Sequence, residues 1–368
     1  MSKAAFGLAA GVAMLLSIAA PAFATGPVTK GDAAMTTILP GDYLAGAWWL
    51  YKSVFVDEGR VVDQANGGIS HSEGQGYGML MAVAANDQAG FEALWSWTQK
   101  ELRVRGDALS AWKWDPKATP HVADSNNATD GDLLVAWALA RAARIWNAPD
   151  YAEAARMILK DLESKAIIES QDFGTILLPA AHGFSAEANP DGPIVNLSYW
   201  VFPALDELGQ LDESFPAKAL LASGQRLLEK GRFGSSSLPA DWLSLKSGDP
   251  TPANGFASVF GYEAVRVPLY AAWLGGPSVA LLAGLERRWS EDPAGPHVME
   301  LSTAAPLAAM PQPGYRAVSG LLSCSLGRSP APRAIPEFEL TDYYSTTLHF
   351  LSVIALSERF PQCLPDQN

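Results

Sequence analysis

Apolar residues recur at helical spacing along most of this chain, and this pattern restricts the folds it can adopt. In eight segments they return at positions i, i+3 and i+4, which marks one face of an α-helix. Between Asp130 and Trp146 the apolar face is wide enough to indicate burial on more than one side. Strand signals are few and short, such as the run that starts at Thr175. We expect helices over 41–56, 73–103, 130–147, 150–164, 214–230, 259–273, 275–288 and 341–357.

Nothing in the sequence divides these helices into separate domains. The chain has 368 residues, with no change of composition, no Ser/Gly-rich linker and no strict internal repeat. A helix-rich chain of this length in one domain suggests helical hairpins arranged in a ring, although the periodicity itself predicts only a mostly α fold. Long Pro- and Gly-rich loops separate the helices, and long ordered loops often carry function. They cover 115–128, 181–195, 231–256, 292–297 and 326–338.

The composition excludes several classes of partner. Apolar residues make up 48% and charged residues 18% of the chain, which rules out disorder as its dominant state. A net charge of −13 argues against binding to nucleic acid or anionic lipid and leaves neutral ligands such as sugars open. The 12 Trp residues are consistent with surfaces that stack on sugar rings.

The first 24 residues are organised like a secretory signal peptide. Lys3 supplies the positive charge, Leu8–Ala20 is the apolar region, and Ala22–Ala24 is a small-x-small cleavage site. No later stretch reaches the roughly 18 uninterrupted apolar residues of a spanning helix. We therefore expect cleavage after Ala24, a mature domain over 25–368 in the periplasm or outside the cell, and no membrane span.

Two cysteines, Cys324 and Cys363, lie near the C-terminus. In an exported protein they could form one disulfide, or they could be two buried free thiols, and spacing alone does not separate these alternatives. Together with five scattered His residues they show no metal-ligand spacing. We therefore expect neither a metal ion nor another cofactor.

The glycine-rich segment His71–Leu80 is the first candidate for chemistry. Three glycines follow Glu73 at a helix start, where they are costly unless the backbone must approach something closely. Glu73 could be a general acid, or Ser72 could cap the helix with Glu73 as an ordinary acidic residue of the first turn. A helix N-terminus stabilises a carboxylate, so a general acid here needs apolar walls or a second carboxylate to raise its pKa.

Charged and aromatic residues also gather ahead of the next predicted helix. Thr129 stands where an N-cap is expected, and Asp130 and Asp132 fall in the first turn, which fits either a function or ordinary helix-start chemistry. Upstream, Trp112 and Trp114 could stack on a sugar face, although we expect one of the two in the core.

A third segment, Phe260–Pro268, places Glu263 and Arg266 three residues apart on one helical face. The pair could belong to a site or could be a structural ion pair.

Four segments in this order resemble glycoside hydrolase family 8, and in particular the periplasmic endoglucanases of bacterial cellulose-synthesis operons. The similarity runs from about residue 42 to 357, and each segment alone is only moderately specific. The segments are Ser72–Asp87, Ala128–Asp132 with the following 136–142, Phe260–Pro268, and Asp342–Thr346.

The resemblance implies a single-domain (α/α)6 barrel that hydrolyses β-1,4-glycosidic bonds with inversion. It implies that Glu73 is the general acid and that the position of the general base falls on Glu263. It implies substrate-side roles for Asp130, which would grip the distorted sugar, and for Trp114, Tyr199, Arg266 and Tyr343.

Glu263 departs from the pattern, because the cellulase branch of the family has Asp at this position. An inverting enzyme needs room for a water molecule, with its two carboxyl groups about 6.5–9.5 Å apart. An extra methylene could intrude on that water by about 1 Å, and misplacement of this size can cost about 100-fold in rate. Glu263 could serve as the base, activity could be weakened, or another carboxylate such as Asp241 could take over; we favour the first.

The sequence therefore predicts an inverting endo-β-1,4-glucanase that acts on a cellulose-like polysaccharide, with the cellulose-synthesis or export machinery as a candidate partner. A chitosanase or xylanase of the same family is an alternative. A different alternative is a glycan-binding protein of polysaccharide export that has lost its chemistry at Glu263.

Overall fold

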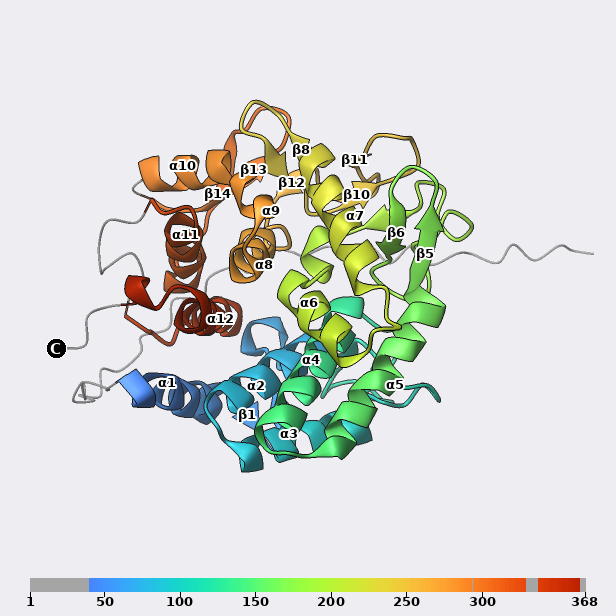
Figure 1. Ribbon diagram of the computed structural model, residues 1–368, viewed down its shortest axis with the longest axis vertical. Coiled ribbons are helices and arrows are strands. Elements are labelled where there is room, and N and C mark those ends of the chain that lie inside the picture. Colours follow the sequence, from blue (N-terminus) through green and yellow to red (C-terminus); the bar gives the residue numbers. More distant parts are fainter. Residues whose placement is uncertain (1–39, 293, 329–336, 365–368) are drawn as a thin grey trace, which may run out of the picture. The chain divides into compact units, whose positions relative to one another are not determined.

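The computed structural model describes residues 40–292, 294–328 and 337–364 (Figure 1). The chain divides into two units, Met1–Thr36 and Thr37–Asn368, and every element described below belongs to the second. The predicted signal peptide and its cleavage site lie outside the described residues. No helix in the described part of the chain is both long and apolar enough to cross a membrane.

Six helices form a closed inner ring. Each contacts the next one in chain order, and the last returns to contact the first, so the predicted (α/α)6 barrel is confirmed (Figure 1). The inner helices are α2 (Ser72–Ala84), α4 (Thr129–Ile145), α6 (Phe202–Leu211), α8 (Arg266–Leu274), α11 (Pro313–Ser325) and α12 (Tyr343–Arg359).

The other helices of the described residues pack on the outside of this ring. Figure 1 shows α3, α5 and α7 lying outside α2, α4 and α6, which are also their contact partners. The outer helices are α1 (Pro40–Phe55), α3 (Gln88–Glu101), α5 (Pro149–Ala166), α7 (Ala217–Lys230), α9 (Pro277–Ala280) and α10 (Ala283–Glu291).

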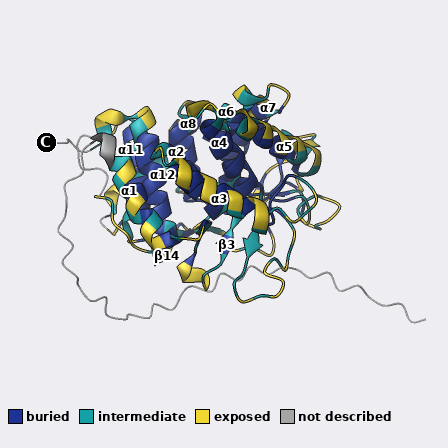
Figure 2. Ribbon diagram, turned by 90° about the horizontal axis from the view of Figure 1, so that it is seen from below, coloured by how far each residue is buried: buried dark blue, intermediate teal, exposed yellow. Residues whose placement is uncertain are grey.

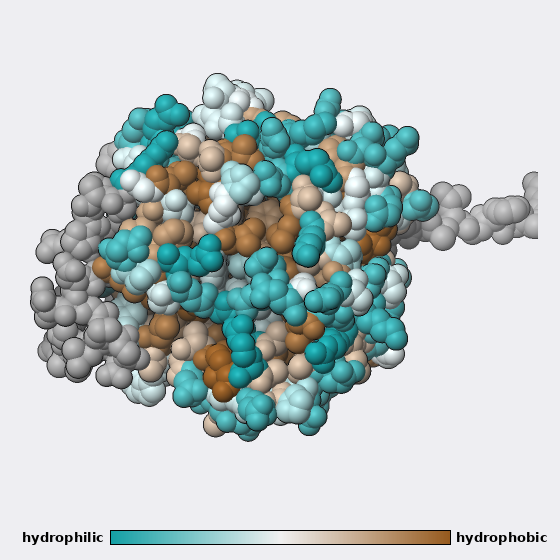
Figure 3. Space-filling view, in the orientation of Figure 1, coloured by the Kyte–Doolittle hydropathy of each residue, from teal (hydrophilic) through white to brown (hydrophobic). Residues whose placement is uncertain are grey.

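Burial differs sharply between the two rings, as Figure 2 shows. Inner helices such as α4 and α12 are buried over most of their circumference, whereas α3 exposes one face to solvent. The wide apolar face predicted from the sequence of α4 is explained by this position, and Trp137 at its centre is fully buried. The outer surface in Figure 3 is mostly hydrophilic, with hydrophobic residues in small groups.

The strands are short and lie in the connections between helices. All of them pair in antiparallel ladders, β1–β2, β3–β4, β5–β6, β8–β9, β11–β10–β7 and β12–β13–β14. Their bounds are β1 Val56–Asp57, β2 Arg60–Val61, β3 Ser70–His71, β4 Lys113–Trp114, β5 Ile167–Ser170, β6 Gly174–Leu177, β7 Ile194–Val195, β8 Arg232–Phe233, β9 Leu238–Pro239, β10 Leu243–Ser244, β11 Thr251–Pro252, β12 Val259–Phe260, β13 His297–Glu300 and β14 Pro306–Ala309. Three short 3-10 helices are η1 Gln64–Asn66, η2 Leu197–Tyr199 and η3 Pro361–Cys363.

Several predicted helix bounds were wrong, for local reasons. The segment 73–103 is two helices, because Asn86 adopts a left-handed conformation (φ 55°) and Asp87 caps α3 by accepting a hydrogen bond from the Gly90 N–H at 2.9 Å. The segment 259–273 starts as strand β12 and becomes helical only at Arg266. The segment 275–288 is interrupted between α9 and α10, and α6 and α11 were not predicted.

A disulfide joins Cys324 on α11 to Cys363 in η3, which decides between the two alternatives left open by the sequence. It ties the segment after α12 back to the neighbouring inner helix.

An ion-pair cluster links four inner helices near their C-terminal ends. Arg141 of α4 donates from Nε to Glu207 of α6 at 3.1 Å and from Nη1 to Glu358 of α12 at 2.6 Å. Its guanidinium lies 4.4 Å from the centre of the Trp137 ring. Trp273 of α8 donates to the same Glu358 at 2.8 Å. The Arg141 side chain is only 10% exposed, so little water screens this cluster.

We predict that Arg141→Ala lowers the free energy of unfolding by about 1–3 kcal/mol, because two partly exposed carboxylates, Glu207 and Glu358, lose their well-packed cation and the Trp137 ring loses its guanidinium contact. Arg144→Ala is the control: this side chain is also on α4 and faces Glu207 at 3.7 Å, but it is 69% exposed. Its loss should cost less than about 1 kcal/mol. Urea unfolding followed by circular dichroism measures both, and equal losses would contradict the assignment.

Candidate active site

Three carboxylates meet at one buried arginine. Arg266 Nη1 contacts Glu73 Oε1 and lies 3.1 Å from Asp130 Oδ2, and Arg266 Nη2 contacts Glu263 Oε2. Arg266 is 3% exposed. The structure thus brings together four residues that the sequence singled out, and we call Glu73, Asp130 and Glu263 the carboxylate cluster.

The barrel places these residues at the N-terminal ends of its inner helices. Glu73 and Asp130 lie in the first turns of α2 and α4, Arg266 is the first residue of α8, and Glu263 is in the turn before it. The partial positive charge at each helix N-terminus favours carboxylates here.

Glycines allow the helices to come this close. A Cβ at Gly131 would lie 2.1 Å from Ser72 Oγ and 2.7 Å from the backbone nitrogen of Glu73, and one at Gly76 would lie 2.5 Å from the Leu134 Cβ. The close backbone approach inferred from the sequence is therefore the contact between α2 and α4.

The predicted capping residues were wrong. Ser72 is already inside α2, and the side chain of His71 caps it by accepting a hydrogen bond from the Gly74 N–H at 3.0 Å. Thr129 is the first residue of α4, and its hydroxyl donates to the Leu178 carbonyl at 2.9 Å.

Burial sets the protonation of the cluster. It raises the pKa of Asp130 well above its usual range, and the nearby charge of Glu263 raises it further. It raises the pKa of Glu263 to about 7, with a further contribution from the charge of Asp241, while hydrogen bonds from Asn196 and Ser198 lower it. Asp130 is 2% exposed, and the Glu73 and Glu263 side chains are 19% and 21% exposed. One guanidinium offsets only part of these three clustered charges, and the raised pKa values of Asp130 and Glu263 favour a bound proton near neutral pH.

Glu73 has one anchored oxygen and one open oxygen. Its Oε1 accepts a hydrogen bond from Tyr77 Oη at 3.0 Å as well as the contact from Arg266. Tyr77 is itself hydrogen-bonded to Tyr270 at 2.7 Å. Glu73 Oε2 accepts no hydrogen bond from the described residues, and His71 Nδ1 lies 3.8 Å from it.

Glu263 repeats this arrangement. Its Oε2 accepts hydrogen bonds from Asn196 Nδ2 at 3.2 Å and Ser198 Oγ at 3.4 Å, in addition to Arg266. Its Oε1 accepts none within the part of the chain that the structure describes. Each of these two carboxylates can therefore bind or exchange a proton through its second oxygen without leaving its anchor.

Two other aspartates are held by hydrogen bonds, Asp132 through both oxygens and Asp241 through Oδ1. Asp132 accepts hydrogen bonds from the Ser110 N–H at 2.8 Å and from Asn127 Nδ2 at 2.9 Å. Asp241, which we considered as an alternative base, accepts from the backbone amides of Gly261 and Ala264.

The remaining sequence-predicted residues surround the cluster at different depths. The Tyr199 ring lies 5.6 Å from the Arg266 guanidinium. Tyr343 is 2% exposed, and its ring packs edge-on to His71. Trp114 pairs with Ser70 in the β3–β4 ladder, ahead of Glu73.

Trp114 is held in a small group of its own. Its ring lies 4.4 Å from the His121 ring, 5.6 Å from Trp97 and 4.9 Å from the guanidinium of Arg60. Its Nε1 donates to Glu101 at 3.3 Å. A sugar that stacks on Trp114 must therefore share the ring with these neighbours.

A second aromatic group lies next to Tyr199. Trp242 stacks against Phe184 with ring centres 5.8 Å apart and against Phe256 at 4.5 Å, and it also contacts Tyr199. Phe184 and Phe256 are partly exposed and come from the long loops 181–195 and 231–256. Partly exposed flat rings beside a polar cluster suit the faces of sugar rings.

Sequence reasoning missed several members of the site. Asn196 and Ser198 immediately precede Tyr199, and Tyr77 lies one helical turn after Glu73, so adjacency to chosen residues could have indicated them. Nothing local marked Trp242.

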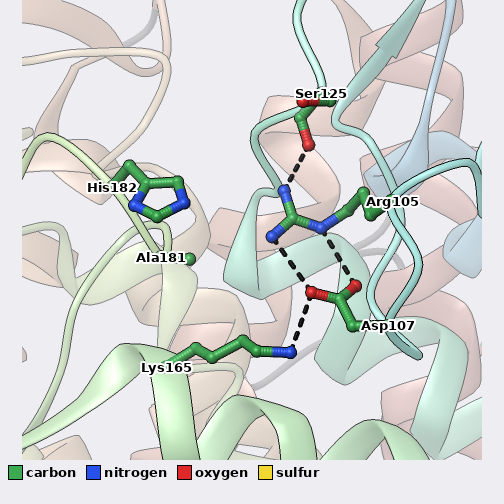
Figure 4. Close-up of a pocket in the computed structure, with 6 residues that line it drawn as sticks. All are labelled: Arg105, Asp107, Ser125, Lys165, Ala181 and His182. Carbon is green, nitrogen blue, oxygen red and sulfur yellow. Dashed lines mark hydrogen bonds and ion pairs between the residues drawn. The ribbon is translucent and has the colours of Figure 1, made fainter.

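A separate pocket of about 410 Å³ lies away from the predicted site residues (Figure 4). Its charged groups neutralise one another: Arg105 Nε donates to Asp107 at 3.1 Å, and Lys165 Nζ lies 2.9 Å from the same carboxylate. We interpret it as a structural network that joins α5 to the loop after α3. The residues that line it are Arg105, Asp107, Ser125, Lys165, Ala181 and His182.

Comparison with known proteins gives a consistent result. The model of glycosyl hydrolases family 8 matches residues 31–286. A probable endoglucanase from Novacetimonas hansenii is 38% identical over 323 residues, which are 86% of this chain and 92% of that protein. The endo-β-1,4-glucanase CMCax from Acetobacter xylinum has a TM-score of 0.77 at 37% identity, over 87% of this chain and 99% of its own. The family 8 endoglucanase Cel10 from Klebsiella pneumoniae has a TM-score of 0.76 at 34% identity, over 85% and 99%.

We predict that Gly131→Ala destabilises the protein by about 1–3 kcal/mol, because the added methyl group overpacks the contact between α2 and α4. Gly284→Ala is the control, since a Cβ there meets only the Ser236 carbonyl oxygen at 3.8 Å. In α10 the replacement should stabilise by up to about 1 kcal/mol, through helix propensity alone. Urea unfolding measures both variants, and a gain in stability for Gly131→Ala would refute the close-contact argument.

Proposed function

Because this chain belongs to glycosyl hydrolases family 8, we propose that its carboxylate cluster hydrolyses internal β-1,4 bonds of a cellulose-like glucan with inversion at the anomeric carbon. The observation that carries the proposal is the arrangement of Glu73 and Glu263. They bind the two nitrogens at opposite ends of one guanidinium, and each keeps one oxygen free. Relatives described as endoglucanases support the glucan as substrate.

In this mechanism Glu73 protonates the leaving glycosidic oxygen from Oε2 as the C1–O bond breaks. A water molecule attacks C1 from the opposite face of the sugar and transfers a proton to Glu263 Oε1. Exchange with solvent then returns a proton to Glu73 and removes one from Glu263. Arg266 contacts both carboxylates and fixes their relative position. A single displacement with water requires about 6.5–9.5 Å between the two carboxyl groups.

Asp130 and the aromatic side chains bind the substrate in this proposal. Asp130 is held by Arg266 and is buried, so a hydrogen bond from it to a sugar hydroxyl would form in a place with little competing water. Tyr199 borders the cluster, and the stacked rings around Trp242 extend the surface away from it. A net charge of −13 is compatible with a neutral polysaccharide.

We also propose that the protein acts after export from the cytoplasm, together with cellulose synthesis or export. The signal-peptide pattern of residues 1–24 supports export to the periplasm or beyond. The resemblance of four segments to the cellulose-operon branch supports a partnership with cellulose synthesis or export. Release of reducing ends from carboxymethylcellulose by the purified mature protein tests the activity itself. Binding of the polymer without release would instead favour a glycan-binding protein.

We predict that Glu263→Gln loses about 100- to 10,000-fold in turnover, because an amide cannot accept the proton of the attacking water. Glu73→Gln should show a loss of the same order, because it removes the acid. Glu263→Asp should remain active, since it retains a carboxylate at the position. Steady-state rates on one soluble glucan, with folding checked by circular dichroism, measure all three. A Glu263→Gln variant as active as the wild type would remove Glu263 from the mechanism.

We predict that the first product of a soluble β-1,4-gluco-oligosaccharide is the α-anomer, because a single displacement by water inverts C1. Proton NMR of the earliest products, before mutarotation, distinguishes the two anomers. An initial β-anomer would mean a retaining mechanism and would exclude the role of base for Glu263.

A further inference from the structure

Glu263 is not part of a helix; it lies in a turn between β12 and α8. The turn is closed by a hydrogen bond from the Val265 N–H to the Gly261 carbonyl at 3.1 Å and one from the Arg266 N–H to the Glu263 carbonyl at 3.2 Å. Val265, the residue that precedes α8, provides no side-chain cap. The two amides of Gly261 and Ala264 on this turn therefore need an acceptor from elsewhere in the chain.

Asp241 supplies that acceptor. Its Oδ1 accepts from the Gly261 N–H at 2.7 Å and from the Ala264 N–H at 2.9 Å, and its own N–H donates to the Val259 carbonyl at 2.9 Å. These contacts hold the turn on both sides of Glu263. Asp241 is 8% exposed, so the bonds are poorly accessible to water.

The fit between this carboxylate and the turn is close. A Cβ at Gly261 would lie 2.5 Å from Asp241 Oδ2, so only glycine leaves room for the side chain here. Within the described residues no Lys, Arg or His forms an ion pair with Asp241. Burial raises the pKa of Asp241 to about 6, while the backbone hydrogen bonds from the turn lower it. At neutral pH it therefore carries a negative charge that no cation of the described residues neutralises directly.

Several other groups face Glu263 from the surrounding elements. Among the described residues Arg266 of α8 is the only cation in contact with it, and Asn196 and Ser198 donate hydrogen bonds from the β7–η2 region. Glu73 of α2 and Asp130 of α4 share that cation. The charge of Glu263 also contributes to the raised pKa values of buried Tyr270 and of half-buried Tyr199 and Tyr344.

We infer that Asp241 is a positioning residue for the base, which holds the Glu263 turn through two backbone amides and faces Glu263 with an unneutralised negative charge. The inference rests on the proposed role of Glu263. It assigns Asp241 a part in the reaction through the Glu263 turn, to whose amides its Oδ1 is bound.

The negative charge of Asp241 affects the pKa of Glu263 in a direction that can be predicted. A negative neighbour disfavours ionisation, and it contributes to the pKa of about 7 for Glu263. The base works only when ionised, so this pKa sets the acid-side limb of the activity profile. Removal of the charge at Asp241 lowers the pKa of Glu263 and moves that limb to lower pH.

The test compares two substitutions that separate the charge from the hydrogen bonds. Asp241→Asn keeps an oxygen acceptor for the two amides and removes the charge, whereas Asp241→Ala removes both. Asp249→Asn is the matched control, because it lies on the same long loop and its side chain is 87% exposed. The full mature protein is used throughout, and kcat is measured from pH 4 to 9 on one soluble glucan, a range that extends about 3 units below and about 2 units above the expected limb.

We expect Asp241→Asn to retain a maximal kcat within a few-fold of the wild type, with its acid limb lower by on the order of 1 pH unit. Asp241→Ala should lose about 100-fold at every pH, as expected for a base displaced by about 1 Å. Asp249→Asn should leave both the limb and the rate unchanged. An unshifted limb in Asp241→Asn, or an active Asp241→Ala, overturns the inference.

Two further outcomes separate this inference from the proposed function. If Asp241→Asn is inactive at every pH while Glu263→Gln is active, Asp241 is itself the base and the inference fails. If the wild type releases no reducing ends, the proposed function fails. In that case the titration midpoint of the Glu263 carboxyl group is measured by carbon NMR on protein labelled at its glutamates. The Glu263 signal is assigned as the one that is missing from the spectrum of Glu263→Gln. A lower titration midpoint in Asp241→Asn supports the electrostatic contact, and an unchanged one overturns it.

Discussion

The site depends on one buried guanidinium that touches three carboxylates. Burial raises the pKa of Asp130 and of Glu263, and Arg266 offsets only part of the cost of ionising them. The arrangement therefore requires the N-terminal ends of α2, α4 and α8 to meet within the reach of one side chain. Glycines at positions 76 and 131 meet this requirement, because any side chain there would clash with the facing helix. The same excess of negative charge keeps a proton in the cluster, which acid–base chemistry needs.

The barrel holds this arrangement from its opposite end. Arg141 joins α4, α6 and α12 through two glutamates, and Trp273 of α8 shares one of them. The disulfide between Cys324 and Cys363 restrains the last inner helices. Packing and ion pairs thus fix the ring, and the long loops carry the aromatic surface beside the cluster. Because the carboxylate cluster lies at the helix ends and the aromatic rings lie on loops, the loops can vary in sequence without moving the carboxylates.

The glutamate at position 263 is accommodated by anchoring rather than by extra space. One of its oxygens is bound by Asn196, Ser198 and Arg266, and the turn beneath it is held by Asp241. Glutamate has one more side-chain torsion than aspartate. When its carboxylate is held by hydrogen bonds this torsion is restrained, so the carboxylate is positioned more precisely than that of an unanchored glutamate. This anchoring is compatible with a glutamate in the proposed role of base, where the related branch has an aspartate.

The sequence by itself determined most inner and outer helices, the (α/α)6 barrel through family resemblance, and the identity of Glu73, Asp130, Glu263 and Arg266. The helices follow from the spacing of apolar residues, and the four charged residues stand out because they lie at or near predicted helix starts. It did not reveal the break at Asn86, the helix α11, or the real caps, because left-handed turns and caps depend on neighbours as much as on residue type.

Only the tertiary structure decided which groups meet. Arg266 is separated from Glu73 by 193 residues and from Asp130 by 136, and the two cysteines are 39 residues apart. Asn196 lies near Tyr199 in the sequence and Asp241 was considered only as a base, but the contacts of both with the distant Glu263 turn exist only in the folded chain. Helix propensity acts over a few residues, whereas these contacts exist only after the ring has closed and brought the N-terminal ends of its helices together.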